Sequence, residues 1–401
     1  MASKLQDLIN RLCPNGVEYR KLGEVFTRLR GTPITAGKMK EIAASDGEIR
    51  IFAGGKTVVD AHESDIPHAN ITRTPAVLVQ SRGVIDFVYC DRPFTFKNEM
   101  WAYTADDSRA VKFLYYVLQN NSKFFRESAS GMGALPQISL RVTEDFLIPV
   151  PPLEVQSEIV QILDNFAELT AELSAELEKR MKQYEHYRRA LLCGVESSEL
   201  RVESSAWPMV KLGDVCDRIC SGGTPAVAHK EYYGGAIPWL RTQEVDWVDI
   251  SATALTITEE GLANSSAKWI EPNCVIVAMY GATAGKVAVN KIPLTTNQAC
   301  CNLHVDSHKA EYRFVFHWLS NNYAQLKALG QGSQSNINAK IVREFPIPLP
   351  PLAEQRRIVS ILDRFDRLCN DLTSGLPAEI AARKKQYAYY RDKLLAFPRA
   401  S

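Results

Sequence analysis

Residues 149–166 read PVPPLEVQSEIVQILDNF, and residues 348–365 read PLPPLAEQRRIVSILDRF. The second string repeats the first at a constant offset of 199 residues. A further pair, KQYEHYRRALL from Lys182 and KQYAYYRDKLL from Lys385, repeats at an offset of 203. Self-similarity at a nearly fixed offset indicates duplication, so each half of the chain should hold a block of about 130 residues followed by a segment of about 40.

The two repeated segments are predicted to be long helices. Pro151 and Pro152 are tolerated only before or within a first helical turn, so the first helix should begin near Leu153. Forty residues at 1.5 Å each give a rod of roughly 60 Å. Apolar and aromatic residues recur at heptad a and d positions, which predicts an antiparallel helix pair held by Leu163, Phe166, Leu173, Leu177, Tyr184, Phe365, Leu368, Leu372, Tyr387 and Tyr390.

The second segment differs from the first in two respects. Gly375 and Pro377 interrupt its apolar ladder, so a break or stutter is expected there. Its net charge also has the opposite sign, because residues 348–401 carry +4 and residues 149–200 carry −5. We therefore expect the acidic and basic segments to face one another, although two unrelated solvated faces would give the same count.

The remaining two blocks mix strands and helices. Short β-rich runs lie at residues 76–79, 86–89 and 274–279, and aromatic helical patches lie at residues 111–118 and 312–319. The predicted fold is two α/β (α+β) domains joined by two long antiparallel coiled-coil helices, with an internal pseudo-two-fold duplication. The expected bounds are a first domain at 1–148, a central helix at 149–195, a second domain at 196–347 and a C-terminal helix at 348–401.

Composition excludes several classes of protein. With 401 residues, 46% hydrophobic and 23% charged, the chain is expected to form more than one globular domain. Its longest clean apolar run, residues 275–279, is too short to span a bilayer, and the start lacks a secretory apolar core, so a cytoplasmic location is expected. Nine cysteines, without a CxxC pair, favour reduced thiols over disulfides or a zinc ribbon.

No local motif of a catalytic site is present. The string at residues 281–287, GATAGKV, is too short for a phosphate loop and ends in valine. The chain also lacks a GxSxG string, a GxGxxG string after a strand, a methyltransferase [DNS]PP[YFW] string and a nuclease (D/E)xK element. A duplicated chain without such motifs favours a binding role without a cofactor or metal, although a spatial constellation could still form an enzyme site.

The repeated helix signatures, together with SGGTP at 221–225, IPWL at 237–240, TNQA at 296–299 and Asn336-Ile337-Asn338, resemble the specificity subunit of type I restriction-modification systems. The resemblance covers nearly the whole chain. It implies two target-recognition domains that each read one half of a split double-stranded DNA sequence, and helices that act as a spacer and dock methyltransferase (modification) subunits, expected to number two. Restriction and translocase subunits would be indirect partners, and no membrane partner is expected.

The first block departs from the second block's pattern. Arg30-Gly31-Thr32-Pro33 matches only part of SGGTP, and IPWL has no obvious partner in the first block. The two halves are therefore expected to read different sequences.

The candidate DNA-binding residues are donor-rich side chains set in Gly-containing loops, the types that reach phosphates and base edges. In the second block they are Ser221, Thr224, Lys230, Arg241, Thr242, Gln243, Tyr280, Lys286, Asn297, Gln298, Gln334 and Asn336. In the first block they are Arg30, Thr32, Lys38, Lys40, Arg50, Lys56, Thr57, Ser81, Arg82, Lys97 and Asn98. Ordinary loop capping is the competing interpretation for each residue of the second block, and a solvated turn is the competing interpretation for the Lys38-Met39-Lys40 cluster. We expect Trp101, Trp239 and Trp269 to be core residues rather than stacking platforms for bases.

Arg82-Gly83 follows a predicted strand in the place that Tyr280-Gly281 occupies in the second block. A net charge of +1 argues against a free-standing DNA binder, because non-specific affinity depends on Lys and Arg neutralising phosphates. A non-catalytic recognition subunit, whose partners supply basic surface, is the leading hypothesis. The alternatives are a nuclease or methyltransferase with an unrecognised site and a purely structural helical adaptor.

Overall fold

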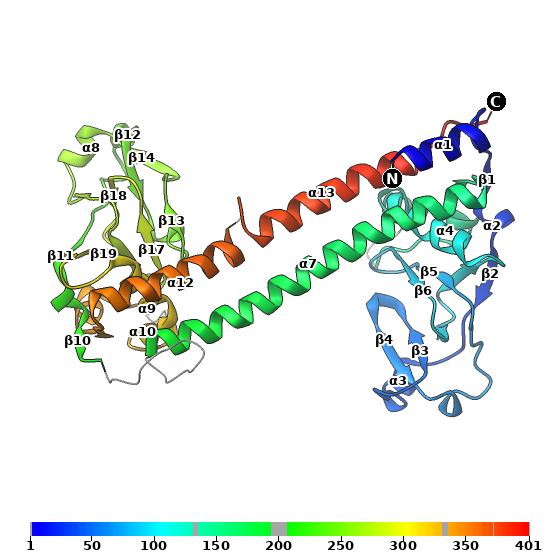
Figure 1. Ribbon diagram of the computed structural model, residues 1–401, viewed down its shortest axis with the longest axis horizontal. Helices are drawn as coiled ribbons and strands as arrows, with labels where there is room; N and C mark the ends of the chain where they lie inside the picture. Colours follow the sequence, from blue (N-terminus) through cyan, green and yellow to red (C-terminus); the bar gives the residue numbers. More distant parts are fainter. Residues whose placement is uncertain (1, 131–134, 194–206, 331–335, 372, 401) are drawn as a thin grey trace. The chain divides into compact units, whose positions relative to one another are not determined.

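The computed structural model describes residues 2–130, 135–193, 207–330, 336–371 and 373–400. Internal contacts divide the chain into two units, Met1–Ser174 with Glu379–Ser401 (unit 1) and Ala175–Ala378 (unit 2). Each unit is described separately (Figure 1). Within the described residues, no helix combines the length and apolar character that crossing a membrane requires.

Unit 1 contains the first domain. Its helices are α1 (Ala2–Leu12), α2 (Leu22–Val25), α3 (Ala36–Glu41), α4 (Ser108–Asn120), α5 (Ser122–Glu127) and α6 (Leu140–Glu144). Its strands are β1 (Tyr19–Lys21), β2 (Thr27–Arg30), β3 (Ile49–Phe52), β4 (Val58–Ala61), β5 (Ala76–Gln80), β6 (Asp86–Cys90), β7 (Phe94–Phe96), β8 (Trp101–Thr104) and β9 (Leu147–Pro149). The long helix α7 (Leu153–Cys193) begins in this unit and ends in unit 2.

Unit 2 contains the second domain. Its strands are β10 (Met209–Lys211), β11 (Cys216–Ser221), β12 (Tyr233–Leu240), β13 (Asp249–Ile250), β14 (Leu255–Ile257), β15 (Trp269–Ile270), β16 (Val275–Ala278), β17 (Val287–Asn290), β18 (Leu294–Thr296), β19 (Cys300–Val305) and β20 (Pro346–Pro348). Its helices are α8 (Glu259–Ala263), α9 (Tyr312–Asn321), α10 (Tyr323–Ala328), α11 (Ala339–Glu344) and α12 (Leu352–Asn370), and α13 (Leu376–Leu394) continues into unit 1.

The sheets of the two units share one topology. Unit 1 has the orders β2-β8-β5-β6 and β4-β3-β7, and unit 2 has β11-β19-β16-β17-β13 and β14-β12-β18-β15. In both units the second strand of the smaller sheet pairs in parallel with the third, β3 with β7 and β12 with β18. The predicted duplication therefore extends to strand order, and unit 2 adds the short strands β13 and β15.

This topology also supplies the partner that the IPWL string lacked. Trp239 pairs with Thr295 and Leu240 with Thr296 in unit 2, whereas Ile51 pairs with Thr95 and Phe52 with Phe96 in unit 1. Residues 49–52, IRIF, thus occupy the place of IPWL. The sequence comparison missed the match because a strand position requires only an apolar, β-favouring side chain and not a particular one.

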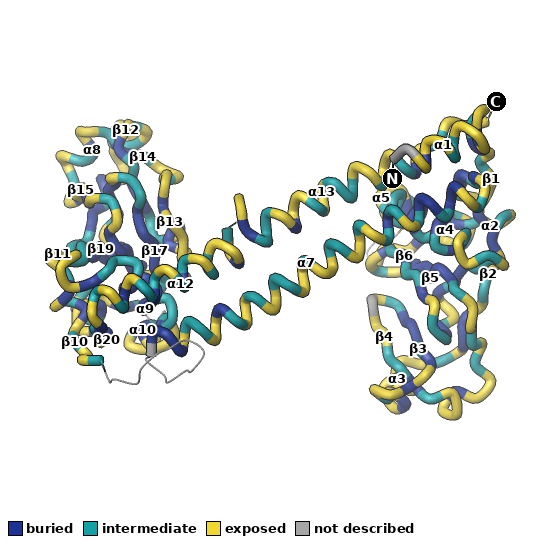
Figure 2. Tube along the Cα trace, in the orientation of Figure 1, coloured by how far each residue is buried: buried dark blue, intermediate teal, exposed yellow. Residues whose placement is uncertain are grey.

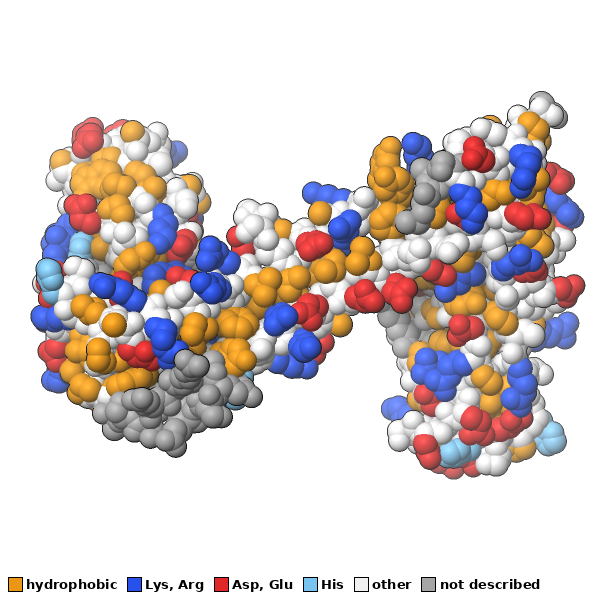
Figure 3. All heavy atoms as spheres, in the orientation of Figure 1, with side chains coloured by type: hydrophobic (Ala, Val, Ile, Leu, Met, Phe, Trp, Pro, Cys, Tyr) orange, Lys and Arg blue, Asp and Glu red, His pale blue; other side chains and the backbone are white. Residues whose placement is uncertain are grey.

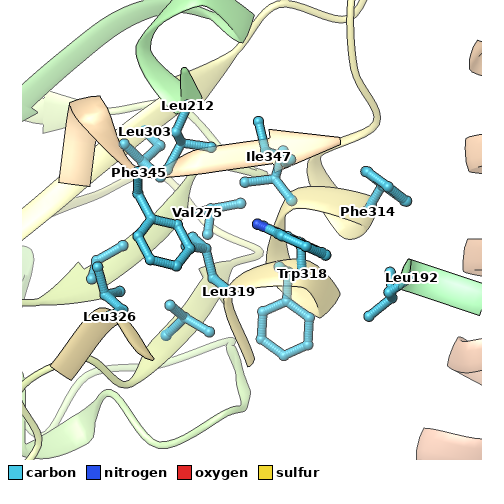
Figure 4. Packing of buried hydrophobic residues seen from close by; sticks show 14 of the residues in the cluster. Leu192, Leu212, Val275, Leu303, Phe314, Trp318, Leu319, Leu326, Phe345 and Ile347 are labelled. Carbon is cyan, nitrogen blue, oxygen red and sulfur yellow. The ribbon is translucent and has the colours of Figure 1, made fainter. Parts of the chain in front are cut away.

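Each domain has a core on both faces of its larger sheet. Alternate residues of a strand point to opposite faces, so Val275 and Val277 join the core under the helices, while Ile276 and Ala278 join a separate core against the smaller sheet. Figure 4 shows the first of these cores, where Phe314 and Trp318 of α9 lie beside Val275 and Leu192. In unit 1, β5 divides its side chains between two cores in the same way.

The predicted long helices are confirmed. α7 begins at Leu153, directly after the two prolines, and runs for 41 residues. The expected break is also present, because α12 ends at Asn370 and α13 starts at Leu376. Gly375 allows the close turn between them, since a Cβ there would lie 2.4 Å from the carbonyl oxygen of Arg367.

Aromatic rings hold the helices together within each unit. In unit 1 the ring of Phe166 on α7 stacks on Tyr390 of α13, with centroids 5.5 Å apart. In unit 2 Tyr184 on α7 stacks on Phe365 of α12 at 6.0 Å. Figure 2 colours α7 dark blue where it packs on a domain and mainly teal and yellow between. In each unit a pair of aromatic rings therefore forms part of the contact between α7 and the neighbouring helix.

The other residues expected along the helix pair are placed less uniformly. Leu163 is buried in the core that contains α4, and Leu177 packs at the edge of the unit 2 core. Leu173 is half-buried, Leu368 is 37% exposed, and Tyr387 lies 6.5 Å from the ring of Phe166. Leu372 lies outside the described residues.

Charges on the helices pair locally. Arg180 binds Glu176 and Lys182 binds Glu178 along α7, while Arg383 pairs with Glu379 along α13. These three cations therefore pair within their own helix and not, as expected, with the oppositely charged segment. Partners four residues away on the same helix satisfy a long side chain without requiring alignment of two helices.

Candidate nucleic-acid interface

In unit 2 the loops that carry the predicted residues meet at one edge of the smaller sheet. β12 and β18 are parallel, so their carboxyl ends lie at the same edge, where Arg241-Thr242-Gln243 and Asn297-Gln298 follow. The backbone N–H of Asn297 donates to the carbonyl of Leu240 at 3.0 Å and holds the two loops together.

The SGGTP loop lies against the same edge. The N–H of Gly223 donates to the carbonyl of Thr296 at 2.9 Å, and a Cβ on Gly222 would lie 1.8 Å from that carbonyl oxygen. Only glycine permits this approach. It brings Thr224 to Gln298, whose side-chain oxygen accepts a hydrogen bond from the threonine hydroxyl. Three predicted loops therefore converge.

A fourth loop, residues 280–286, adjoins them. The Thr283 hydroxyl donates to the carbonyl of Thr242 at 2.8 Å. Gly281 has a φ of 80°, which favours glycine, and its N–H donates to the Asn336 side-chain oxygen at 3.3 Å. Tyr280, 42% exposed, leads this turn. Gln334 lies outside the described residues.

Two buried polar atoms at this edge have no hydrogen-bond partner within the described residues, Nε of Arg241 and the side-chain oxygen of Asn297. Burying such atoms unpaired costs free energy, and functional sites are where that cost is commonly found. By contrast, the Lys286 ammonium lies 2.6 Å from Asp246 and 4.5 Å from the Trp247 ring centroid. Its charge is therefore partly compensated inside the protein.

Unit 1 repeats this construction with different side chains. The N–H of Lys97 donates to the carbonyl of Phe52 at 3.0 Å, as Asn297 does to Leu240. The N–H of Thr32 donates to the carbonyl of Phe96 at 2.6 Å, as Gly223 does to Thr296. Arg30, Thr32, Lys97 and Asn98 are thereby brought together.

The turn at Arg82-Gly83 also matches its counterpart. Ile138 donates its N–H to the carbonyl of Ser81 at 3.0 Å, and Ile337 donates to that of Met279 at 2.9 Å. Gly83 and Gly281 have φ values of 78° and 80°. Arg82 thus stands where Tyr280 stands in unit 2, exposed and without a side-chain hydrogen bond or ion pair to the described residues.

Several predicted residues of unit 1 are occupied by internal contacts. The buried Thr32 hydroxyl binds the Thr95 hydroxyl at 2.6 Å and accepts from the N–H of Asn70 at 2.9 Å. The Ser81 hydroxyl donates to the carbonyl of Glu99 at 2.9 Å. Arg50 binds Asp60 at 3.0 and 3.2 Å, and its hydrogen bonds lower the pKa of that carboxyl. Thr32 and Ser81 hold loops together, and Arg50 braces a strand.

The remaining predicted residues differ in availability. Lys97 pairs with Glu99 at 2.8 Å, whereas exposed Arg30 and Asn98 have no side-chain hydrogen bond or ion pair in the described part of the chain. Lys38 pairs with Glu41 on α3, which also carries exposed Lys40. Of the remaining predicted residues, Ser221 is half-buried, and Lys230, Gln243 and Thr57 are exposed. The side chain of Lys56 is not among those that the structure describes.

The prediction that three tryptophans lie in the core is wrong for one of them, Trp269. Trp239 is 4% exposed and donates to the carbonyl of Gly223 at 3.0 Å, and half-buried Trp101 donates to Thr143. Trp269 is 43% exposed on β15, where it pairs with Thr295. β15 is an edge strand of its sheet, with a neighbouring strand on one side. An exposed ring next to the converging loops was not expected.

The surface charge and the absence of a metal-ligand cluster among the described residues restrict the chemistry that this site could perform. Blue and red side chains alternate on the visible face of each unit in Figure 3, in keeping with a net charge of +1. Among the described residues, no cluster of three or more His, Cys, Asp or Glu side chains could hold a metal ion.

Comparison with known proteins agrees with this arrangement. The family model "Type I restriction modification DNA specificity domain" matches residues 14–183 and again residues 204–382. The Escherichia coli type I restriction enzyme EcoR124I/EcoR124II specificity subunit is 36% identical over 306 residues, which cover 73% of this chain and 72% of the relative.

Solved structures share the fold. The S subunit of a type I restriction-modification system from M. genitalium has a TM-score of 0.64 at 16% identity, covering 95% of this chain and 96% of that chain. A chain from a structural study of type I R-M complex assembly and conformational transition has a TM-score of 0.56 at 21% identity, covering 95% and 98%. With both domains matched and a relative aligned over most of its length, the chain belongs to the type I restriction-modification DNA specificity family.

Proposed function

We propose that this chain is the non-catalytic DNA-recognition subunit of a type I restriction-modification complex and that each domain reads one half of a bipartite target. One observation carries the proposal. Both domains bring the same loops together through the same backbone hydrogen bonds, yet they present different side chains there. An equivalent scaffold with different donors is suited to reading two different sequences.

The residues proposed to read the DNA bases lie in the converging loops at the edge of the smaller sheet. Their side chains still have hydrogen-bond donors or acceptors available. In the first domain they are Arg30, Arg82 and Asn98, with Lys97 beside them. In the second domain they are Arg241, Gln243, Asn297, Gln298 and Tyr280, with Trp269 as a ring on which a base or sugar could pack. Thr32, Ser81 and Arg50 are assigned to holding the scaffold.

We also propose the roles of the helices and the partners. α7, α12 and α13 form a coiled-coil spacer that sets the gap between the half-sites, and this spacer docks two methyltransferase subunits, with restriction subunits joining indirectly. The division into residues 1–148, 149–195, 196–347 and 348–401 belongs to the same proposal. A subunit that acts on cellular DNA belongs in the cytoplasm.

The test exchanges one domain at a time. Residues 17–148 are replaced by those of a relative with a different target, and in a matched variant residues 207–347 are replaced instead. Single-molecule sequencing of methylated DNA from cells carrying the complete system then reports the motif. Each exchange should change one half-site and leave the other half-site and the gap intact. A change of both half-sites by either exchange would contradict the assignment.

A further inference from the structure

The aspartate of the repeated ILD string makes a directed contact with the reading domain in unit 2. Asp363 on α12 accepts hydrogen bonds from Nε and Nη2 of Arg313 at 3.0 and 2.7 Å. The same carboxylate oxygen lies 2.7 Å from Nε2 of His317. Arg313 and His317 are four residues apart on α9, so they share one face of that helix.

Unit 1 has the equivalent contact with different chemistry. Asp164, at the offset of 199, accepts a hydrogen bond from the Tyr116 hydroxyl and lies 3.5 Å from Nζ of Lys112. Lys112 and Tyr116 are again four residues apart, on α4. The strings KFLYYVL from Lys112 and RFVFHWL from Arg313 align without a gap. In each unit one helix aspartate thus meets a cation and a second donor from the domain.

Burial distinguishes the unit 2 contact from ordinary surface pairs, whereas in unit 1 Tyr116 is buried but Lys112 and Asp164 are 26% and 43% exposed. The side chains of Arg313 and His317 are 13% and 1% exposed, and Tyr116 is 3% exposed. Burial alone would raise the pKa of Asp363, but the hydrogen bonds from His317 and Arg313 lower it to about 2. Partial burial makes such a pair sensitive to the loss of one partner.

In unit 2 the contact continues toward the reading loops. Nη1 of Arg313 also binds Asp249 of β13 at 3.0 Å, and Asp249 lies 3.5 Å from Lys291. Asp246, three residues earlier, binds Lys286 in the 280–286 loop. Arg313 therefore joins the spacer helix to the segment that braces the reading edge.

We propose that Asp164 and Asp363 are positioning residues that fix the angle between each spacer helix and its reading domain, and so determine how strictly the gap between half-sites is measured. The apolar contacts around them are non-directional and tolerate small rotations, whereas hydrogen bonds have defined geometry. This inference rests on the proposed function. It assigns these residues to spacing and not to base identity.

The test uses the complex with its methyltransferase subunits and duplexes built on the wild-type target. Asp363→Asn and Asp164→Asn keep the side-chain shape and remove the charge. Asp366→Asn is the matched control, because this neighbour on α12 lies 3.7 Å from Arg313 and makes only a weak contact. A double change, Arg313→Lys with His317→Tyr, gives unit 2 the donors of unit 1 and should act like wild type.

Two competition ratios are measured for each complex. The first compares the wild-type duplex with duplexes whose gap is one base pair longer or shorter, and the second compares it with a duplex altered in one half-site. Asp363→Asn and Asp164→Asn should lower the gap ratio about tenfold and leave the half-site ratio unchanged. An unchanged gap ratio, or an equal fall in both ratios, would overturn the inference. A wild-type complex without a preference for any duplex would instead defeat the proposed function.

Discussion

Replacing Phe365 by alanine should weaken unit 2 far more than replacing Leu368, although both residues lie on α12 at heptad positions. The Phe365 ring stacks on Tyr184 at 6.0 Å with 13° between ring planes, and it meets Tyr187 edge-on at 5.3 Å. Tyr184 is 8% exposed, so the ring that Phe365 covers belongs to the core. Leu368 is 37% exposed.

The expected magnitudes follow from these contacts. A fully buried Phe→Ala change costs about 3 to 5 kcal/mol, and a half-buried one roughly half of that. Losing two aromatic pairs adds about 0.5 to 1.5 kcal/mol each, while the better helix propensity of alanine returns about 0.5 kcal/mol. Phe365→Ala should therefore lower the free energy of unfolding by about 3 kcal/mol, and Leu368→Ala by about 1 kcal/mol or less.

Native-state hydrogen exchange on the full chain is the suitable assay, because it localises the loss to α12 and the last turns of α7 and does not require two-state unfolding. Amides of these segments should exchange faster in Phe365→Ala, with those of the first domain unchanged. Equal acceleration by Leu368→Ala would refute the reasoning that stacked rings, and not heptad position alone, hold the helices.

Other variants test separate parts of the molecule. Four residues inserted after Leu173 add about 6 Å, so the methylated motif should keep its half-sites and lengthen its gap by about one or two base pairs, which methylation sequencing would detect. Arg241→Ala should weaken discrimination at one base of the second half-site by about 1 to 3 kcal/mol in competition binding, without affecting the first. Burial lowers the pKa of His317, which faces Asp363, Arg313 and Asp366. As pH falls below about 6.5, the unfolded chain therefore binds a proton at this histidine that the folded chain does not. The free energy of unfolding of unit 2, measured by urea titration, should fall by up to about 1.4 kcal/mol per pH unit. His317→Tyr should abolish this pH dependence.

The parts of the fold that local chemistry determines were predictable. A pair of prolines directly precedes the first residue of α7 and of α12, and Gly375 and Pro377 mark the interruption before α13. The aromatic patches became α4 and α9, and the runs at 76–79 and 274–279 became β5 and β16. In each case the signal lies within a few residues of the feature.

The candidate site was less predictable, because exposure is decided by a partner distant in sequence. Thr32 looks like an available hydroxyl until Thr95 and the Asn70 N–H occupy it. Trp269 looks like a core residue, but its strand lies at an edge. Arg180 and Lys182 could have paired across helices, yet each has a carboxylate one turn away. The amino-acid composition of the loops therefore predicts where the site lies, but not which of its residues are available to bind a ligand.

The way the loops are held explains how one scaffold can read two sequences. The contacts that align them are made by backbone atoms, Lys97 to Phe52 and Thr32 to Phe96 in unit 1, with Asn297 to Leu240 and Gly223 to Thr296 in unit 2. Backbone hydrogen bonds do not depend on the side chain that the residue carries. Two positions in these loops require glycine, Gly31 and Gly222, where a Cβ would lie 2.6 and 1.8 Å from a carbonyl oxygen. Thr32 and Ser81 also hold loops through their hydroxyls, and the Thr224 hydroxyl donates to Gln298. Within the described residues, exposed Arg30, Arg82 and Asn98 make no such contact. Their side chains can therefore change, and with them the base preference of one domain, while the backbone contacts that align the loops stay the same.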